Sequence, residues 1–294
     1  MLRYVDNYPE EDPVHFGIAI FPTEYSIQPG PLARAMEDRG FESLWVSEHS
    51  HIPLSRKTAW PGGADLPKHY YDTYDPFVAL TAAATATRTL KVGTGICLVV
   101  QRDPIHTAKS VSSLDQISGG RFLFGVGGGW NEEEMSDHGT EFRSRWKLLR
   151  ERIEAMKAIW TEDKPEYHGE LVDFDPMVMS PKPVQKPHPP IHVGGSFPNG
   201  ARRAIRYGNG WMPLGGRDSS IVKQLKDFRQ LAQDAGRDPD DFELSIYYGS
   251  PEPKDLAAYR DAGVARVIFM MPSEDETSLL GRLDALASAT QVGG

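Results

Sequence analysis

The chain has 294 residues, a length that allows either one large α/β barrel or two domains, and its composition is that of an ordinary globular protein. The formal net charge of −9 and the absence of a Lys/Arg run argue against nucleic acid or an anionic membrane as a partner and favour a small molecule. The single Cys97 excludes an internal disulfide, and we see no signal peptide or membrane span, so we expect a cytoplasmic protein that borrows any redox chemistry from a cofactor.

The first third of the chain predicts a βαβ unit. Residues 1–13 are polar and contain proline, so we expect an arm that packs loosely or reaches a partner subunit. Residues 14–21 read as a buried strand, Pro29 opens a helix that Gly40 ends, and 43–47 read as a second strand. A strand, a helix and a second strand close right-handed, which makes the strands parallel.

An irregular loop follows this unit. Residues 52–75 are rich in proline, glycine and aromatic residues, and we expect them to form a functional lid. An Ala/Thr-rich helix over 76–87 then leads to a third strand over 90–98. Gly93 and Gly95 inside that strand predict a bulge, a kink or the close approach of a flat group.

The fourth strand carries the strongest local signal. Residues 104–117 form a predicted helix, and the apolar run 122–126 opens into GGGWNEEE at 127–134. Glycine lets the backbone approach another group closely. The aromatic, amide and acidic residues that follow at 130–134 are a combination that packing alone would not call for. We interpret this stretch as one wall of a pocket for a flat cofactor ring.

The rest of the chain repeats the strand and helix pattern around one insertion. An amphipathic helix is expected over 143–160, and the proline-rich segment 161–190 is expected to be an insertion with a small hairpin near 167–170. The remaining strands are expected at 191–193, 210–213, 242–248 and 265–271, and the remaining helices at 199–207, 221–235, 256–262 and 277–289.

Eight strands that each precede a helix predict a (β/α)8 TIM barrel, with 1–294 as a single domain. An open dinucleotide-binding sheet is disfavoured because no G-x-G-x-x-G follows the first strand. Active sites of such barrels are built at the carboxyl ends of the strands. This rule selects Glu48 and His49, Thr94 and Gly95, residues 128–131, residues 194–196, and Trp211.

Glu48 and His49 are the candidates for proton transfer, because such side chains are readily tuned to neutral pH. The alternative is a loop carboxylate beside exposed imidazoles. His49 and His51 could also form half of a metal site, as in amidohydrolase-type barrels, but the further ligands that those sites need are not found.

Residues 194–196 (GGS) precede a helix and could hold a phosphate through backbone amides, the helix dipole and the Ser196 hydroxyl. Arg202 and Arg203 on the following helix could add positive charge to this site or could be solvated. The alternative for residues 194–196 is an ordinary turn before a helix. Trp130, beyond its strand, could line the pocket, whereas Trp45 inside a strand is expected in the core.

Four segments carry a family resemblance when they are taken together: 90–96 (LKVGTGI), 118–134 (SGGRFLFGVGGGWNEEE), 189–195 (PPIHVGG) and 208–213 (GNGWMP). In this order they resemble the bacterial luciferase-like monooxygenase family, and more narrowly its branch that uses the deazaflavin coenzyme F-420. The resemblance runs over about residues 14–211 and continues more weakly to the C-terminus.

The resemblance implies a luciferase-type barrel with the insertion after strand four and a flavin or deazaflavin at the carboxyl strand ends. It implies a bulge, often a non-prolyl cis peptide, near Thr94, Gly95 or Ile96 behind the ring system. It also implies that Glu48 or His49 lies near the reactive ring. Residues 48–51 (EHSH) depart from the aromatic-flanked His pair of the luciferases, which favours deazaflavin hydride transfer over peroxyflavin chemistry.

We therefore expect an oxidoreductase that transfers hydride between coenzyme F-420 and a small organic substrate. The alternatives are an FMN-dependent monooxygenase served by a separate flavin reductase, a non-catalytic flavin-binding protein, and a metal hydrolase. A homodimer is expected because family members commonly pair, and no metal is expected. The predicted catalytic residues are Glu48 and His49, and the predicted cofactor-binding residues are Thr94, Gly95, Gly128, Gly129, Trp130, Asn131, Gly194, Gly195 and Ser196.

Overall fold

The computed structural model describes residues 14–63, 65–215 and 220–290, and within them eight parallel strands close a barrel. Their order around the barrel is β1, β2, β3, β4, β7, β8, β9 and β10, and β10 pairs back onto β1. The predicted TIM barrel is therefore confirmed. The strands are β1 His15–Ile20, β2 Ser43–Val46, β3 Lys91–Thr94, β4 Phe122–Val126, β7 Ile191–Gly194, β8 Gly210–Met212, β9 Glu243–Tyr247 and β10 Arg266–Met270.

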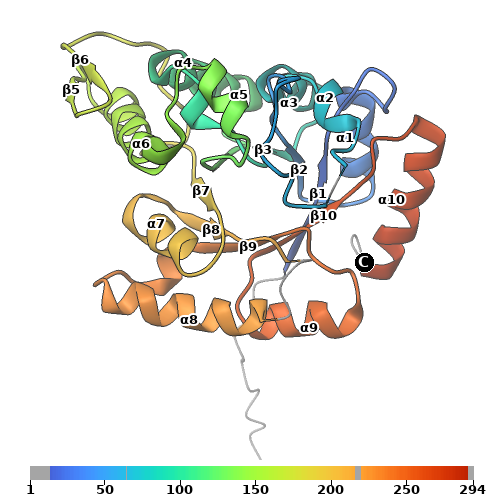
Figure 1. Cartoon of the computed structure of the whole chain (residues 1–294). Helices are drawn as coiled ribbons and strands as arrows, with labels where there is room; N and C mark the ends of the chain where they lie inside the picture. Colours follow the sequence, from blue (N-terminus) through green and yellow to red (C-terminus); the bar gives the residue numbers. More distant parts are fainter. Residues whose placement is uncertain (1–13, 64, 216–219, 291–294) are drawn as a thin grey trace, which may run out of the picture.

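Helices surround the strands, with α3 and α4 on one side and α8 and α9 on the other (Figure 1). Asp75 and Asp103 begin α3 and α4 by accepting hydrogen bonds from the first free backbone amides, and a proline follows each of them. The helices that alternate with the strands are α1 Pro29–Asp38, α3 Pro76–Ala86, α4 Pro104–Ser118, α6 Arg145–Thr161, α7 Asn199–Tyr207, α8 Ile221–Asp234, α9 Pro253–Asp261 and α10 Glu276–Thr290.

Shorter elements lie in the loops. The expected lid is not wholly irregular, because α2 (His69–Asp72) forms within it, and α5 (Glu132–Asp137) follows the glycines of β4. The insertion carries the antiparallel hairpin of β5 (Tyr167–His168) and β6 (Asp173–Phe174), which lies at the outer edge beside α6 (Figure 1). The predicted arm, 1–13, lies outside the described residues. None of the helices described is long and apolar enough to cross a membrane.

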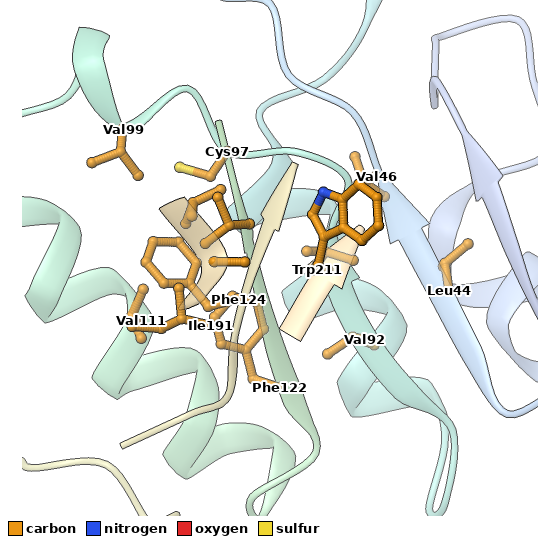
Figure 2. Close-up of a cluster of buried hydrophobic side chains, with 14 of the residues drawn as sticks. Leu44, Val46, Val92, Cys97, Val99, Val111, Phe122, Phe124, Ile191 and Trp211 are labelled. Carbon is orange, nitrogen blue, oxygen red and sulfur yellow. The ribbon is translucent and has the colours of Figure 1, made fainter. Parts of the chain in front are cut away.

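The core has two parts because successive strand residues face opposite sides. Residues that face outward, such as Val92 and Phe122, pack against helices such as α4, as Figure 2 shows. A smaller cluster fills the barrel itself, and Trp45 belongs to it, fully buried as the sequence predicts. The other buried members of this inner cluster are Ala19, Leu123, Met212, Tyr247 and Ile268.

Two predictions about strand ends are wrong. Trp211 does not point into the barrel: its ring is buried on the outside of β8 and stacks on Phe228 of α8, because Met212 occupies the inward position, and its Nε1 atom donates a hydrogen bond to the Gly195 carbonyl at 2.9 Å. The third strand is shorter than predicted and ends at Thr94. The chain turns there and returns to the sheet only through an isolated bridge between Cys97 and Val126.

The amino end of the barrel is closed by buried charges. Arg266 of β10 donates hydrogen bonds to both carboxylate oxygens of Glu42 at 2.7 Å and to Glu243 at 3.0 Å. Lys91 also pairs with Glu42, at 2.9 Å. Burial opposes the charge of Arg266, but the two carboxylates outweigh it and raise the pKa of its guanidinium. Ion pairs and hydrogen bonds thus stabilise the amino end of the barrel.

Candidate active site

The backbone bends at the carboxyl end of β3, where the peptide bond between Gly95 and Ile96 is cis. The Gly95 carbonyl accepts hydrogen bonds from the Ser47 hydroxyl at 2.9 Å and the Tyr247 hydroxyl at 2.5 Å. A Cβ atom at Gly95 would lie 2.5 Å from that tyrosine oxygen, so only glycine fits. The predicted position of a non-prolyl cis peptide is confirmed, and Thr94 beside it is buried with its hydroxyl on the Gly125 carbonyl.

The glycines after β4 leave room for neighbouring side chains. A Cβ atom at Gly128 would lie 2.5 Å from the ring of Trp146, which projects from the first turn of α6. Gly129 has a φ of +66°, a left-handed conformation that suits glycine, and Met135 and Leu98 pack against it. The backbone of this segment therefore runs flat along the indole of Trp146.

Two arginines stack on the same indole. The Arg203 guanidinium lies 3.7 Å from the Trp146 ring centre and that of Arg145 lies 4.7 Å from it. Arg203 also lies against the turn after β7, where a Cβ atom at Gly195 would be 3.3 Å from its Nη2 atom. In the described part of the chain neither guanidinium forms an ion pair with a carboxylate, and the Nε atoms of both are buried without a partner.

Partial burial lowers the pKa of both guanidinium groups, and for Arg145 the charge of Arg203 lowers it further. Both arginines remain charged because the ordinary pKa of arginine lies far above neutrality. Two like charges at one half-buried place favour an anionic ligand, and the nearby Glu132 carboxylate offsets the charge of Arg145 only in part.

Glu48 is buried just after β2, and each of its carboxylate oxygens has a hydrogen-bond donor. One carboxylate oxygen accepts a hydrogen bond from the Leu98 amide at 2.7 Å, and the other lies 2.5 Å from Nε of Arg102. Burial raises the pKa of the Glu48 carboxyl, while Arg102 and the Leu98 amide oppose that change. Through these two donors Glu48 ties β2 to the segment after β3, and its predicted part in proton transfer stays a prediction.

His49 has a different environment. Its Nδ1 atom lies 2.7 Å from Oε2 of Glu134, and the two side chains are 6% and 0% exposed. The ring also contacts Trp130 and Tyr70, with ring centres 5.7 and 5.2 Å away. Nε2 of His49 makes no hydrogen bond to any residue that the structure describes. A carboxylate that fixes one imidazole nitrogen and leaves the other free is an arrangement suited to acid-base catalysis.

The 52–75 loop packs against this histidine. Tyr70 contacts both His49 and Trp130, and the Arg56 guanidinium lies 5.8 Å from the Trp130 ring centre. Glu133 of α5 holds the loop by accepting hydrogen bonds from the backbone of residues 57 and 58 and from the Thr58 hydroxyl. Burial works against ionisation here, but these hydrogen bonds lower the pKa of Glu133 to about 2.

The other predicted residues lie around the same strand ends. Asn131 is buried and caps α5 through Oδ1, which leaves its Nδ2 atom without a partner among the described residues. Ser196 is exposed beside Gly194 and Gly195. Arg202 is also exposed, whereas Arg203 turns inward. These observations are compatible with the predicted pocket, and the contacts of each residue with a ligand stay a prediction.

His51 lies apart from His49. Its Nε2 atom is 3.0 Å from Asp137, so the two histidines turn to different carboxylates. Across the described ranges, no group of three or more His, Cys, Asp or Glu side chains could hold a metal ion.

Sequence reasoning missed several residues of this region. Trp146 reads as one more apolar position of an amphipathic helix, and Arg145 as part of its charged face. The run 132–134 reads as acidic residues that favour a helix start, and nothing in it distinguishes Glu134, which turns inward. Tyr247 reads as an ordinary strand residue. Each of these signals depends on a partner distant in the sequence.

The closed parallel barrel with a cis peptide after β3 is a TIM barrel, a fold that hosts many enzymes, so its class comes from similarity to known proteins. The family model described as "Luciferase-like monooxygenase" matches residues 30–287. The chain therefore belongs to the luciferase-like monooxygenase family, and it is a luciferase-like oxidoreductase, as its sequence predicts.

Similar proteins cover most of the chain. It is 38% identical over 281 residues to "Uncharacterized protein Rv0953c" of Mycobacterium tuberculosis, which covers 94% of this chain and 98% of that protein. It is 30% identical over 210 residues to the "F420-dependent hydroxymycolic acid dehydrogenase" of the same organism, covering 70% and 54% of the two chains. The crystal structure of monooxygenase RslO1 from Streptomyces bottropensis is 26% identical, with a TM-score of 0.66 and coverage of 95% and 80%.

Proposed function

We propose that this protein is a coenzyme F-420-dependent oxidoreductase in which His49 transfers the proton that accompanies hydride transfer to or from a small organic substrate. The observation that most supports this proposal is the buried pair of His49 and Glu134. It fixes Nδ1 of the imidazole and leaves Nε2 without a hydrogen bond to the described residues, at the carboxyl end of the barrel. A relative that is an F420-dependent dehydrogenase supports the choice of cofactor.

The residues present fit a flat, phosphate-bearing cofactor. At Gly128 and Gly129 the place of a Cβ atom is taken by Trp146, Met135 and Leu98, so the glycines bring the Trp146 indole close to the backbone. Within the described chain Arg145 and Arg203 form no ion pair with a carboxylate, and Arg203 lies against the Gly195 turn, where a Cβ atom would be 3.3 Å from its Nη2 atom. A phosphate is therefore the ligand feature that these arginines would bind, and the planar ring system is proposed from the F420-dependent relative.

Each group has a definable task. A bound deazaflavin would supply the hydride chemistry. Glu134 would hold His49 in the tautomer that carries its proton on Nδ1, and a carboxylate also stabilises the imidazolium. Arg145 and Arg203 would bind the phosphate, and the 52–75 loop would exclude water through Tyr70. Glu48 would position β2 beneath the site and would not exchange protons.

The alternative is an FMN-dependent monooxygenase with a separate flavin reductase, and the likeness to RslO1, a monooxygenase, supports the monooxygenase part of it. Both cofactors carry a phosphate and a three-ring system, so the cation pair does not distinguish them. The departure of residues 48–51 from the histidine pair of luciferases favours the deazaflavin.

The catalytic part of the proposal is tested with His49→Ala and a matched exposed-histidine control, His106→Ala, whose side chain is 93% exposed on α4. We expect His49→Ala to lower kcat about 100-fold or more and to change the cofactor Kd by less than about threefold, because a general acid or base contributes about 10² to 10⁴ in rate. The control should match the wild type. Unchanged turnover in His49→Ala would remove His49 from the reaction.

A further inference from the structure

A chain of hydrogen bonds leads from the buried His49 to the surface. We propose that Ser50, His51 and His138 form a proton relay that connects the pair of His49 and Glu134 with bulk water. The inference rests on the proposed role of His49. It adds three residues that would act on the reaction without touching substrate or cofactor.

The inner end of the chain is closed to solvent. Oε2 of Glu134 lies 2.7 Å from Nδ1 of His49, and Oε1 accepts the Ser50 amide at 3.0 Å. Glu134 is fully buried, so a proton on this carboxyl group needs a carrier to reach water. The Ser50 hydroxyl is the nearest one: its Oγ atom lies 3.5 Å from Oε1 of Glu134. This is the longest link, and the transfer across it should limit the rate of the relay.

The outer end branches at Ser50. Its Oγ atom lies 2.7 Å from Nε2 of His138 and 2.9 Å from Nδ1 of His51. His51 continues to Asp137, whose Oδ2 atom is 3.0 Å from Nε2, and these two side chains are 40% and 58% exposed. Histidine is the side chain that most readily gains and loses protons near neutral pH. One serine hydroxyl therefore lies between a buried carboxylate and two solvent-accessible imidazoles.

The protons balance along this path. When His49 takes a substrate proton at Nε2, it releases the proton of Nδ1 to Glu134. This proton sits on Oε2, so the carboxyl group rotates to bring it to Ser50 Oγ, as Ser50 passes its own proton to His51 or His138, which releases one to water. One proton enters and one leaves, so the cluster keeps its charge and His49 ends with its proton on Nε2. The reverse sequence gives that Nε2 proton to a substrate, takes one in from water and restores the proton on Nδ1.

A purely structural role for these contacts makes a different prediction. The same hydrogen bonds fasten the segment after β2 to α5, and in that role their loss would lower stability without affecting proton movement. Ser50→Ala separates the two roles, because it removes the hydroxyl and keeps the backbone amide on Glu134. Ser50→Thr restores a hydroxyl, and Ser113→Ala removes an exposed hydroxyl of α4 as a control.

The first measurement uses the protein without cofactor. The exchange of the His49 ring N–H proton with water is followed by NMR at pH 7. We expect Ser50→Ala to slow exchange at least tenfold, the double substitution of His51 and His138 by alanine to slow it similarly, and Ser50→Thr and Ser113→Ala to match the wild type. Equal exchange rates in Ser50→Ala and the wild type would overturn the relay.

The second measurement uses the loaded enzyme. Ser50→Ala should lower kcat at least fivefold with little change in KM, and added imidazole should restore part of the rate because it can carry protons to the site. Slow exchange with unchanged kcat would also overturn the relay as a part of the reaction. Failure of the proposed function is distinguishable, because it would appear as normal turnover in His49→Ala.

Discussion

The buried pair of Glu48 and Arg102 offers a direct test of the role of Glu48. Glu48→Gln removes the charge that faces Arg102, and Arg102→Met keeps the aliphatic stem while it removes the guanidinium. The carboxylate is 4% exposed and Arg102 is 24% exposed, so Arg102→Met leaves a buried carboxylate without its counter-charge and Glu48→Gln leaves Arg102 with only the exposed Asp75. Breaking such a pair costs about 3 to 5 kcal/mol, a large part of the roughly 5 to 15 kcal/mol that keeps a protein folded.

The assay is a double-mutant cycle on the free energy of unfolding in urea. Because both single variants break the same interaction, the cost of the double variant should fall short of their sum by about 2 kcal/mol or more. The contact of Arg102 with the exposed Asp75 should contribute little. Additive costs, or a Glu48→Gln variant of wild-type stability whose turnover collapses, would refute the structural role and return Glu48 to catalysis.

Three further predictions concern the carboxyl end of the barrel, its amino end and the 52–75 loop. Gly128→Ala should weaken cofactor binding at least tenfold in a fluorescence titration, because its Cβ atom would displace Trp146; unaltered affinity would contradict the proposed wall. Burial lowers the pKa of His192 to about 4 from an ordinary 6.5, so the unfolded chain binds its proton first as pH falls. Between pH 7 and pH 4 the free energy of unfolding should therefore fall by roughly 3 kcal/mol less in His192→Gln than in the wild type. An equal fall in both proteins would contradict this. Glu133→Ala should speed tryptic cleavage at Lys57, since the loop loses its tether, whereas an unchanged rate would show that other contacts hold it.

The fold could be predicted from the sequence because its signals are local. Apolar runs, helix periodicity and glycines at helix ends occur within a few residues of each other, and Gly40 and Gly263 have the left-handed φ expected there. The exceptions are also informative. Trp211 is a site candidate because it lies near the carboxyl end of the predicted strand 210–213, but neighbouring strand residues face opposite sides and Trp211 faces outward.

The site could be predicted only in part. The segment at 127–131 and the turn at 194–196 stand out through their glycines, and His49 through its position after β2. The partners of His49 and Gly195 could not be predicted, because Glu134 is 85 residues away from His49 and Arg203 becomes relevant only when α7 packs beside α6. One acidic residue in a run of three looks like the others until the fold buries it.

The central claim is that this barrel binds a deazaflavin and not FMN. The most direct measurement is a fluorescence titration of the purified protein with coenzyme F-420 and, separately, with FMN, in the wild type and in a variant with Arg145 and Arg203 replaced by methionine. We predict saturable binding of coenzyme F-420 at least tenfold tighter than that of FMN, and its weakening by about tenfold or more in the double variant. Tight binding of FMN with no affinity for coenzyme F-420 would contradict the account and favour the monooxygenase.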